Sequence, residues 1–294
     1  MTKQGLILKG IGGNYEVLVE DGTKMVCRAR GALRHERLSP LPGDRVLCSP
    51  QENGFVIEQI LPRKNVLVRP RMANVDLIFL VLAAAPEPDL FACDKLTAIA
   101  EHLGIEVVIL INKADLADAS VLAGQYASIG YETRLISACD PRTSLEDILT
   151  KVRGKIACLM GNSGVGKSTI LSRLFPEQEI RTGQVSQRSQ RGRHTTRTVE
   201  LYAVQNGFLA DTPGFSLVEL EEFSFLDKQQ LPAAFREFSP YVEQCLFHDC
   251  SHTSEKGCAV RRAVEEGKIL ARRHENYCRL YEQLRGYKEW QTKK

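Results

Sequence analysis

Residues 1–67 alternate short apolar-rich runs with glycine-containing turns. Asp21-Gly22 and Asn53-Gly54 are pairs that favour tight hairpins between strands. Five strands are predicted here, with the sequences GLILK, YEVLVE, KMVCRAR, DRVLC and GFVIEQIL. So many strands in a short segment predict a small closed β-barrel, an OB-fold. Such a barrel often binds nucleic acid, but it also serves as a rigid spacer.

Residues 68–220 carry nearly continuous apolar runs separated by stretches with helical spacing. The apolar runs are residues 75–82, 107–111, 156–160 and 208–210. The helix-like stretches include residues 94–103 and 167–175. Apolar strands that alternate with helices predict an α/β domain whose parallel sheet is covered on both faces.

Residues 221–294 contain no further strand-like run. Residues 225–238 and 259–290 have helical periodicity, and the segment between them is rich in Cys and His. This part of the chain is predicted to be a small helical domain with too few apolar residues for a core of its own. We therefore expect three domains, spanning residues 1–67, 68–220 and 221–294.

Composition narrows the class of protein. Hydrophobic residues make up 43% and charged residues 26% of the chain, which is ordinary for a globular protein. The longest apolar run, residues 77–85, is too short to span a bilayer, and the N-terminus lacks the pattern of a secretory signal. We expect a cytoplasmic protein that makes no membrane contact.

Basic residues are concentrated in three segments, 28–37, 181–197 and 261–294. Together they suit a surface that binds a polyanion such as nucleic acid. Solvated loops and helix faces are the alternative explanation for each segment. The arginines that suit nucleic-acid binding by the barrel are Arg28, Arg30, Arg34 and Arg37.

The clearest functional motif is a glycine-rich loop between the apolar run 156–160 and a helix-like run. Glycines let the backbone amides face phosphate oxygens at the N-terminus of a helix. Lys167 is expected to bridge the β- and γ-phosphates, and Ser168 to ligate Mg²⁺. The residues expected to hold the nucleotide here are Gly161, Asn162, Ser163, Gly164, Val165, Gly166, Lys167, Ser168 and Thr169.

The segment DTPG, from Asp211 to Gly214, follows a short apolar run beyond the phosphate loop. An acid at the end of a neighbouring parallel strand can hold the Mg²⁺ shell, and the Gly214 amide can meet the γ-phosphate. Between the loop and Asp211, the segment RGRHTT offers Thr195 and Thr196. We expect Thr196 to close over the γ-phosphate and Mg²⁺, as a mobile switch loop does. The two threonines also fit the start of a strand expected over residues 198–202.

Base recognition is assigned to the segment NKAD, which contains Asn112, Lys113 and Asp115 and ends an apolar run. The Asp115 carboxylate can accept hydrogen bonds from both N1–H and the 2-amino group of guanine, whereas adenine offers no such pair of donors. Asn112 suits the other edge of the base, and the Lys113 stem can pack along the ring. Ser137 and Ala138 form the small-residue loop expected near the purine oxygen. These motifs favour GTP over ATP.

The order of the motifs differs from that of most GTPases. The base segments come first, and the phosphate loop, the threonines and the Mg²⁺ acid follow them. Cutting and rejoining a chain at exposed loops preserves its spatial neighbours. The order therefore predicts a circularly permuted GTPase.

The Cys- and His-rich segment supplies ligands for a metal. Three thiolates and one imidazole suit tetrahedral Zn²⁺ with no open position, so one structural ion that contributes folding energy is expected. The predicted ligands are Cys245, Cys250, His252 and Cys258. His248 is an alternative ligand, and the remaining cysteines, Cys139 among them, are expected to be buried small hydrophobes.

A small barrel, a permuted GTPase and a C-terminal Cys/His domain together resemble the RsgA (YjeQ) family of bacterial GTPases of small-ribosomal-subunit biogenesis. The resemblance covers essentially the whole chain and includes NKAD, GNSGVGKS, RGRHTT, DTPG and the cysteine spacing, which selects His252 over His248. It implies ribosome-stimulated hydrolysis of GTP to GDP and phosphate, and a late role in maturation of the 30S subunit. It also implies contact with 16S rRNA. We expect a monomer.

Hydrolysis is expected to be slow without a partner. Many GTPases orient the attacking water with a glutamine after the Mg²⁺-side glycine, but Phe215 occupies that position here. His194 is a candidate to position water, acting with Lys167 and Thr196; a histidine that faces solvent or RNA is the alternative. Phe215 also leaves open an RNA-binding module that is gated by nucleotide and hydrolyses little. NKAD and DTPG argue against a kinase or ATPase.

Overall fold

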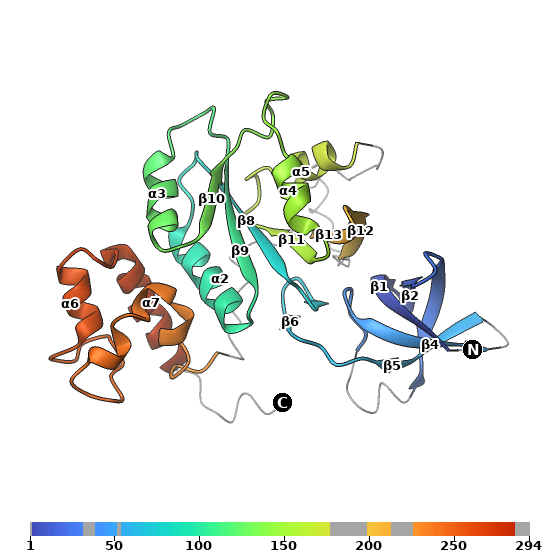
Figure 1. The fold of residues 1–294 in the computed structure, drawn as a ribbon, viewed down its shortest axis with the longest axis horizontal. Coiled ribbons are helices and arrows are strands. Elements are labelled where there is room, and N and C mark those ends of the chain that lie inside the picture. The colour runs from blue at the N-terminus through green and yellow to red at the C-terminus, as the bar shows by residue number, and fades with distance from the viewer. Residues whose placement is uncertain (1, 32–38, 52–53, 177–198, 213–225, 286–294) are drawn as a thin grey trace, which may run out of the picture. The chain divides into compact units, whose positions relative to one another are not determined.

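The structure is a computed structural model that describes residues 2–31, 39–51, 54–176, 199–212 and 226–285 (Figure 1). Contacts between Cα atoms divide the chain into two compact units. The first comprises Met1–Val81 and Ser137–Phe215, and the second comprises Leu82–Ile136 and Ser216–Lys294. No helix in these described ranges is long and apolar enough to cross a membrane.

The N-terminal strands form a closed barrel in the order β1-β2-β3-β5-β4, which confirms the predicted five-stranded, OB-like barrel. They are β1 (Lys3–Ile11), β2 (Asn14–Val19), β3 (Lys24–Ala29), β4 (Arg45–Gln51) and β5 (Gly54–Ile60). Neighbouring strands are antiparallel except β3 and β5, which pair in parallel. Because successive side chains point to opposite faces, alternate residues fill the interior. That core consists of Ile7, Val17, Val19, Met25, Cys27, Val46, Cys48 and Ile57.

A six-stranded sheet of order β10-β9-β8-β11-β13-β12 follows the barrel. Its strands are β8 (Leu77–Ala83), β9 (Glu106–Asn112), β10 (Glu132–Leu135), β11 (Ile156–Met160), β12 (Glu200–Val204) and β13 (Gly207–Asp211). β8 and β11 are buried at every position, which explains their uninterrupted apolar sequences. The pairs β9–β10, β8–β11 and β11–β13 are parallel, as predicted. β12, which overlaps the strand expected over residues 198–202, is an antiparallel edge strand.

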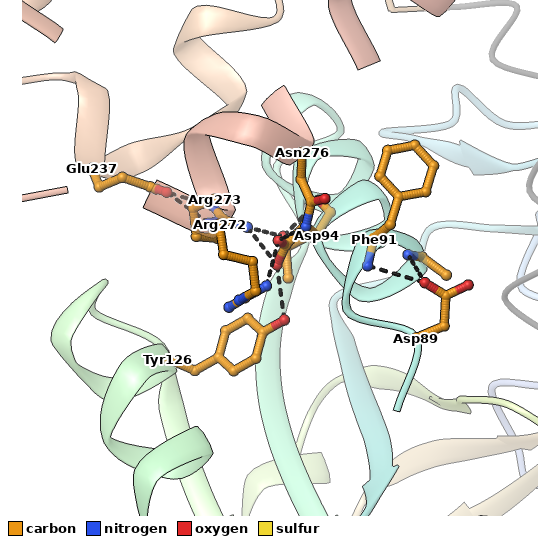
Figure 2. Close-up of polar contacts among 10 residues, drawn as sticks. Asp89, Phe91, Asp94, Tyr126, Glu237, Arg272, Arg273 and Asn276 are labelled. Carbon is orange, nitrogen blue, oxygen red and sulfur yellow. Dashed lines mark hydrogen bonds and ion pairs between the residues drawn. The ribbon is translucent and has the colours of Figure 1, made fainter. Parts of the chain in front are cut away.

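Within the described residues, four helices alternate with the strands of this sheet along the chain, and a two-stranded ladder precedes it. The helices are α2 (Leu90–His102), α3 (Ser120–Ser128), α4 (Glu146–Val152) and α5 (Lys167–Leu174), and the ladder pairs β6 (Val66–Leu67) with β7 (Met72–Ala73). Asp89 is the N-cap of α2, and its carboxylate accepts hydrogen bonds from the N–H groups of Phe91 and Ala92 (Figure 2). This cap satisfies two backbone donors that the first turn leaves unpaired.

The C-terminal part is helical, but less continuously than its sequence predicted. The stretch 259–290 contains two helices in its described part, α6 (Ala259–Glu265) and α7 (Ala271–Arg285). Gly267, with φ of +72°, ends the first helix in a left-handed conformation that favours glycine. The helix predicted over 225–238 is wrong: the described residues form 3₁₀ turns, η2 (Pro232–Ala234) and η3 (Arg236–Phe238), followed by η4 (Val242–Gln244). Pro232 has no N–H to continue an α-helical ladder.

The C-terminal helices share one core with α2. Phe235, Phe238 and Tyr277 are fully buried and belong to the same apolar cluster as Ala98 and Ile99. The Tyr277 ring lies 4.8 Å from that of Phe238 and 5.2 Å from that of Phe235, between ring centroids. The low apolar content of this segment is sufficient because α2 supplies part of the core.

A buried carboxylate joins α2 to α7 within the second unit (Figure 2). Asp94 is fully buried and accepts hydrogen bonds from Tyr126 Oη at 2.8 Å and from Asn276 Nδ2 at 2.6 Å. Arg272 Nη1 lies 2.7 Å from one carboxylate oxygen, and Arg273 Nη1 lies 3.0 Å from the other. Four donors therefore replace the water that Asp94 loses on burial.

Arg273 is itself fully buried and is balanced by a second acid. Its guanidinium donates to both carboxylate oxygens of Glu237, at 2.6 and 3.0 Å, a bidentate arrangement. Arg273 also donates to Thr97 Oγ1 at 3.2 Å, and Thr97 donates to the Asp94 carbonyl. The buried charges of Asp94 and Arg273 at the junction of α2 and α7 are thus each paired and hydrogen-bonded.

We expect Asp94→Asn to destabilise the protein by about 3–5 kcal/mol, because it leaves the buried guanidinium of Arg273 and the partly buried one of Arg272 facing a neutral amide. Urea denaturation followed by far-UV circular dichroism measures the change. Glu266→Gln removes an exposed partner of Lys268 and is the matched control, with no measurable loss expected. Equal denaturation curves for Asp94→Asn and the wild-type protein would contradict this account.

Candidate nucleotide and metal sites

The glycine-rich loop lies between β11 and α5, as its motif predicted. Gly161 passes so close to β8 that a Cβ there would lie 2.2 Å from the carbonyl oxygen of Val81. Gly166 caps α5 with φ of +102°, a conformation that other residues rarely adopt. A side chain at either position would be sterically unfavourable. The loop leads directly into the N-terminus of α5, where backbone N–H groups can bind an anion.

Lys167 folds back over this loop. Its Nζ donates to the carbonyl oxygens of Gly161 at 2.6 Å and Asn162 at 2.9 Å. Burial lowers the pKa of Lys167 to about 8, and the nearby Asp211 carboxylate partly opposes that shift. A lysine with its charged form so disfavoured is poised to gain an anionic partner.

Asp211 ends β13 beside the strand that leads into the loop. β11 and β13 pair in parallel, and the neighbouring Thr212 hydroxyl donates to the Leu159 carbonyl at 2.7 Å. Burial and the facing Glu200 carboxylate raise the pKa of Asp211, while Lys167 lowers it. A partly buried carboxylate next to a second acid is well suited to a divalent cation.

The other predicted loop residues are distributed between buried and exposed positions. Val165 is buried, which anchors the loop, whereas Ser163 and Ser168 are exposed. Ser168 lies in the first turn of α5, as a ligand of a nucleotide-bound cation requires, and Gly164 has a positive φ of +79°. Thr169 is half-buried in the same turn.

The segment NKAD ends β9 in the second unit. Asn112 is buried and its carbonyl accepts a hydrogen bond from the Ala84 N–H, while Lys113 has a positive φ of +63°. The Ala114 N–H donates to the carbonyl of Ile136, at 3.1 Å. These backbone contacts hold the turn, and the Asp115 side chain is exposed.

The predicted base loop follows Ile136 directly in the chain. Ser137 is half-buried and Ala138 is buried, but Cys139 is exposed, so its prediction as a buried small hydrophobe is wrong. The Cys139 side chain lies on a surface loop, where no apolar core is available to bury it. Cys27, Cys48, Cys93 and Cys158 are buried, as expected, whereas Cys278 is only partly buried. His194, Thr195, Thr196, Gly214 and Phe215 lie outside the described residues.

The Cys/His segment gathers the four predicted metal ligands. Their ligand atoms lie within 4.8 Å of one another, in the set Cys245, Cys250, His252 and Cys258. His252 Nδ1 is 3.5 Å from two of the sulfur atoms, and Cys245 Sγ is 3.9 Å from Cys258 Sγ. All nine cysteines fall within the described ranges and are free thiols, so this cluster suits one tetrahedral ion. His248, the alternative ligand, is exposed and lies outside the cluster.

Helix α7 contacts the backbone of the Cys/His cluster. Tyr277 Oη donates to the Ser251 carbonyl at 2.6 Å, and His274 Nε2 lies 2.7 Å from the His252 carbonyl oxygen. The Ala259 N–H donates to Cys245 Sγ at 3.3 Å. Contacts of this kind orient the ligands of a metal site, and no local sequence pattern predicts them because the helix and the loop are distant in the chain.

The basic segments are only partly described. In the barrel, Arg30 forms an ion pair with Glu58, and Arg28 donates to Asn14 Oδ1 at 3.4 Å. Arg34 and Arg37 fall outside the described residues. One of the two described arginines is therefore already neutralised by an acid of the barrel.

Two family models match this chain. The model described as RsgA GTPase matches residues 60–221, and the model described as RsgA N-terminal domain matches residues 4–56. A protein of Ruminiclostridium cellulolyticum named small ribosomal subunit biogenesis GTPase RsgA is 40% identical over 298 residues, covering 99% of this chain and 96% of that protein. A protein of Clostridium novyi with the same name is 39% identical over 286 residues, covering 96% and 97%.

Two solved structures have the same fold. YjeQ from Thermotoga maritima aligns with a TM-score of 0.81 and 32% identity, covering 98% of this chain and 100% of that chain. YloQ, described as a circularly permuted GTPase, aligns with a TM-score of 0.78 and 29% identity, covering 98% and 96%. The resemblance and the permuted fold predicted from the order of the motifs are confirmed.

We expect the affinity for a nucleoside triphosphate to fall about tenfold between pH 7 and pH 9, because Lys167, with its pKa of about 8, loses the proton that pairs with phosphate. Isothermal titration calorimetry across this range measures the fall. Lys167→Met is the control, with weak binding that no longer depends on pH in this way. The same pH slope in Lys167→Met would assign the titration to another group.

Proposed function

The chain belongs to the family of RsgA GTPases and is a GTP-hydrolysing enzyme, and we propose that it acts in biogenesis of the small ribosomal subunit. The relatives that it matches over nearly their whole length carry that role in their names. We propose further that binding to the 30S subunit and its 16S rRNA accelerates hydrolysis, and that the protein acts late in subunit maturation.

The main support for this proposal is the position of two residues. Lys167 follows the loop that leaves β11, and Asp211 ends the parallel neighbouring strand β13. Phosphate oxygens would meet the loop amides and the Lys167 ammonium, while Ser168 and Asp211 would hold Mg²⁺. The cation supplies charge neutralisation at the β- and γ-phosphates when it is bound.

Guanine is the base that we propose for this nucleotide. The exposed Asp115 carboxylate would accept two hydrogen bonds from the base, with Asn112 and Lys113 completing the contact. Ser137 and Ala138 would present the base loop to the purine oxygen. An ATPase or kinase is disfavoured, because a carboxylate facing adenine would find no matching donors.

Turnover is proposed to depend on residues of the segments 181–197 and 213–215. Phe215, which follows Gly214, has no group that can orient water, so unassisted hydrolysis is expected to be slow. We propose that His194 positions the attacking water once the subunit is bound, and that Thr196 closes over the γ-phosphate and Mg²⁺. A nucleotide-gated RNA-binding module with little hydrolysis is the less favoured alternative, since the chain belongs to a family of GTPases.

We propose Zn²⁺ for the cluster of three thiols and one imidazole, as a structural ion. Its residues are preassembled and supported by α7, and no ligand position is left open for substrate. The three-domain division at residues 67 and 220, a monomeric state and a cytoplasmic location, where ribosomal subunits mature, complete the proposal.

The test of this function is phosphate release from GTP and ATP, each with and without purified small ribosomal subunits. We expect slow GTP turnover that rises at least tenfold with subunits, and no turnover of ATP, because base recognition and partner activation act together. Large subunits serve as the matched control. GTP turnover that is indifferent to small subunits would remove the ribosomal role and leave the GTPase.

Zinc removal gives a separate prediction. The purified protein should contain about one zinc ion per chain, and chelation should lower its thermal midpoint until zinc is restored. Mass spectrometry of metal content should show that Cys258→Ser loses the ion and that His248→Ala, a change at an exposed neighbour, keeps it. Stoichiometric zinc in Cys258→Ser would contradict the assigned ligands.

A further inference from the structure

One arginine ties the base loop to the helix of the phosphate loop. Arg173 lies in the last turn of α5, and its guanidinium reaches the chain of residues 138–143. Nη1 donates to the carbonyl oxygens of Ala138 at 3.3 Å and Asp140 at 2.9 Å. Nη2 donates to those of Pro141 at 3.4 Å and Thr143 at 2.7 Å. All of these residues belong to the first unit.

Four carbonyl groups of one short loop therefore converge on a single planar cation. Arginine is suited to this task, because its rigid fork offers several donors at once and stays charged. In a trans peptide unit the N–H and C=O groups point in opposite directions. When the Ala138 carbonyl faces Arg173, the Cys139 N–H of the same peptide unit points away from it, at an exposed position of the loop.

We propose that Arg173 is a positioning residue for purine recognition. It holds the loop so that the Cys139 N–H, on the far side of its peptide unit from Arg173, faces the 6-oxo group of guanine. It also fixes the loop to the same helix whose N-terminus receives the phosphates. This inference rests on the proposed GTP site. Arg173 touches neither base nor phosphate; it acts through the loop that it binds.

The same loop provides a matched control. Arg142 pairs with the Asp140 carboxylate at 2.9 Å, but its side chain is 89% exposed and its contact stays within the loop. Removing Arg142 deletes a guanidinium from the loop without detaching the loop from α5. The two arginines thus separate the anchoring of the loop from its local charge.

The experiment compares the dissociation constants of GDP and 6-thio-GDP for the full-length wild-type protein, Arg173→Met and Arg142→Ala. Sulfur is a weaker hydrogen-bond acceptor than the 6-oxo oxygen, while the rest of the nucleotide is unchanged. We expect Arg173→Met to weaken GDP binding about tenfold, the contribution of about one hydrogen bond, and to weaken 6-thio-GDP binding far less. Arg142→Ala should keep the wild-type preference for GDP.

A loss of equal size for both nucleotides in Arg173→Met would overturn the proposal, because it would show general damage to the phosphate loop. Unchanged GDP affinity would overturn it as well. If Arg173→Met does not fold, Arg173→Lys replaces it; a single ammonium cannot span four carbonyls, so the same selective loss is expected in smaller degree. If the proposed GTP site itself is wrong, the wild-type protein will bind GDP no more tightly than ADP. That result is distinct from either outcome for Arg173→Met.

Discussion

The Asp94 carboxylate is the constraint around which the second unit is arranged. An ionised carboxylate without water costs several kcal/mol, and here the compensation comes from donors on α3 and α7, elements distant from α2 in the chain. Arg273, equally buried, needs both Asp94 and Glu237. A small displacement of α7 along α2 would leave a buried charge without its partner. The ionic contacts therefore disfavour displaced arrangements of the shared apolar core.

Burial shifts the pKa values of Lys167 and Asp211, the two charged groups of the proposed nucleotide site, in opposite directions. It lowers the pKa of Lys167 and raises that of Asp211, so each group is held where its charged form is costly. Phosphates would relieve the first cost and a divalent cation the second. These two buried charges destabilise the empty site. Binding of a nucleotide with its cation removes that cost, which strengthens the binding.

Local sequence predicted those parts of the fold and site that are built from neighbouring residues. The barrel strands, the buried strands β8 and β11 and the phosphate loop each carry their own pattern. The edge strand β10 was not predicted, because its half-exposed positions mix polar and apolar residues, as at Glu132 and Arg134. The contacts of Asp94 and Arg173 join residues that no periodicity links, and only the folded chain brings them together. The roles of His194 and Thr196 remain predictions from motif alone.

The separation of Asp94 from its partners has a consequence for synthesis on the ribosome. Asp94 and Arg272 lie 178 residues apart, so most of the chain is made after the acid and before the cation. Throughout that interval α2 carries a carboxylate that cannot yet be buried with its partners. Native packing of the second unit must await release of the C-terminal helix, which makes it a late step governed by long-range contacts. Truncated chains that end before α7 would expose the apolar face of α2 and become clients of chaperones.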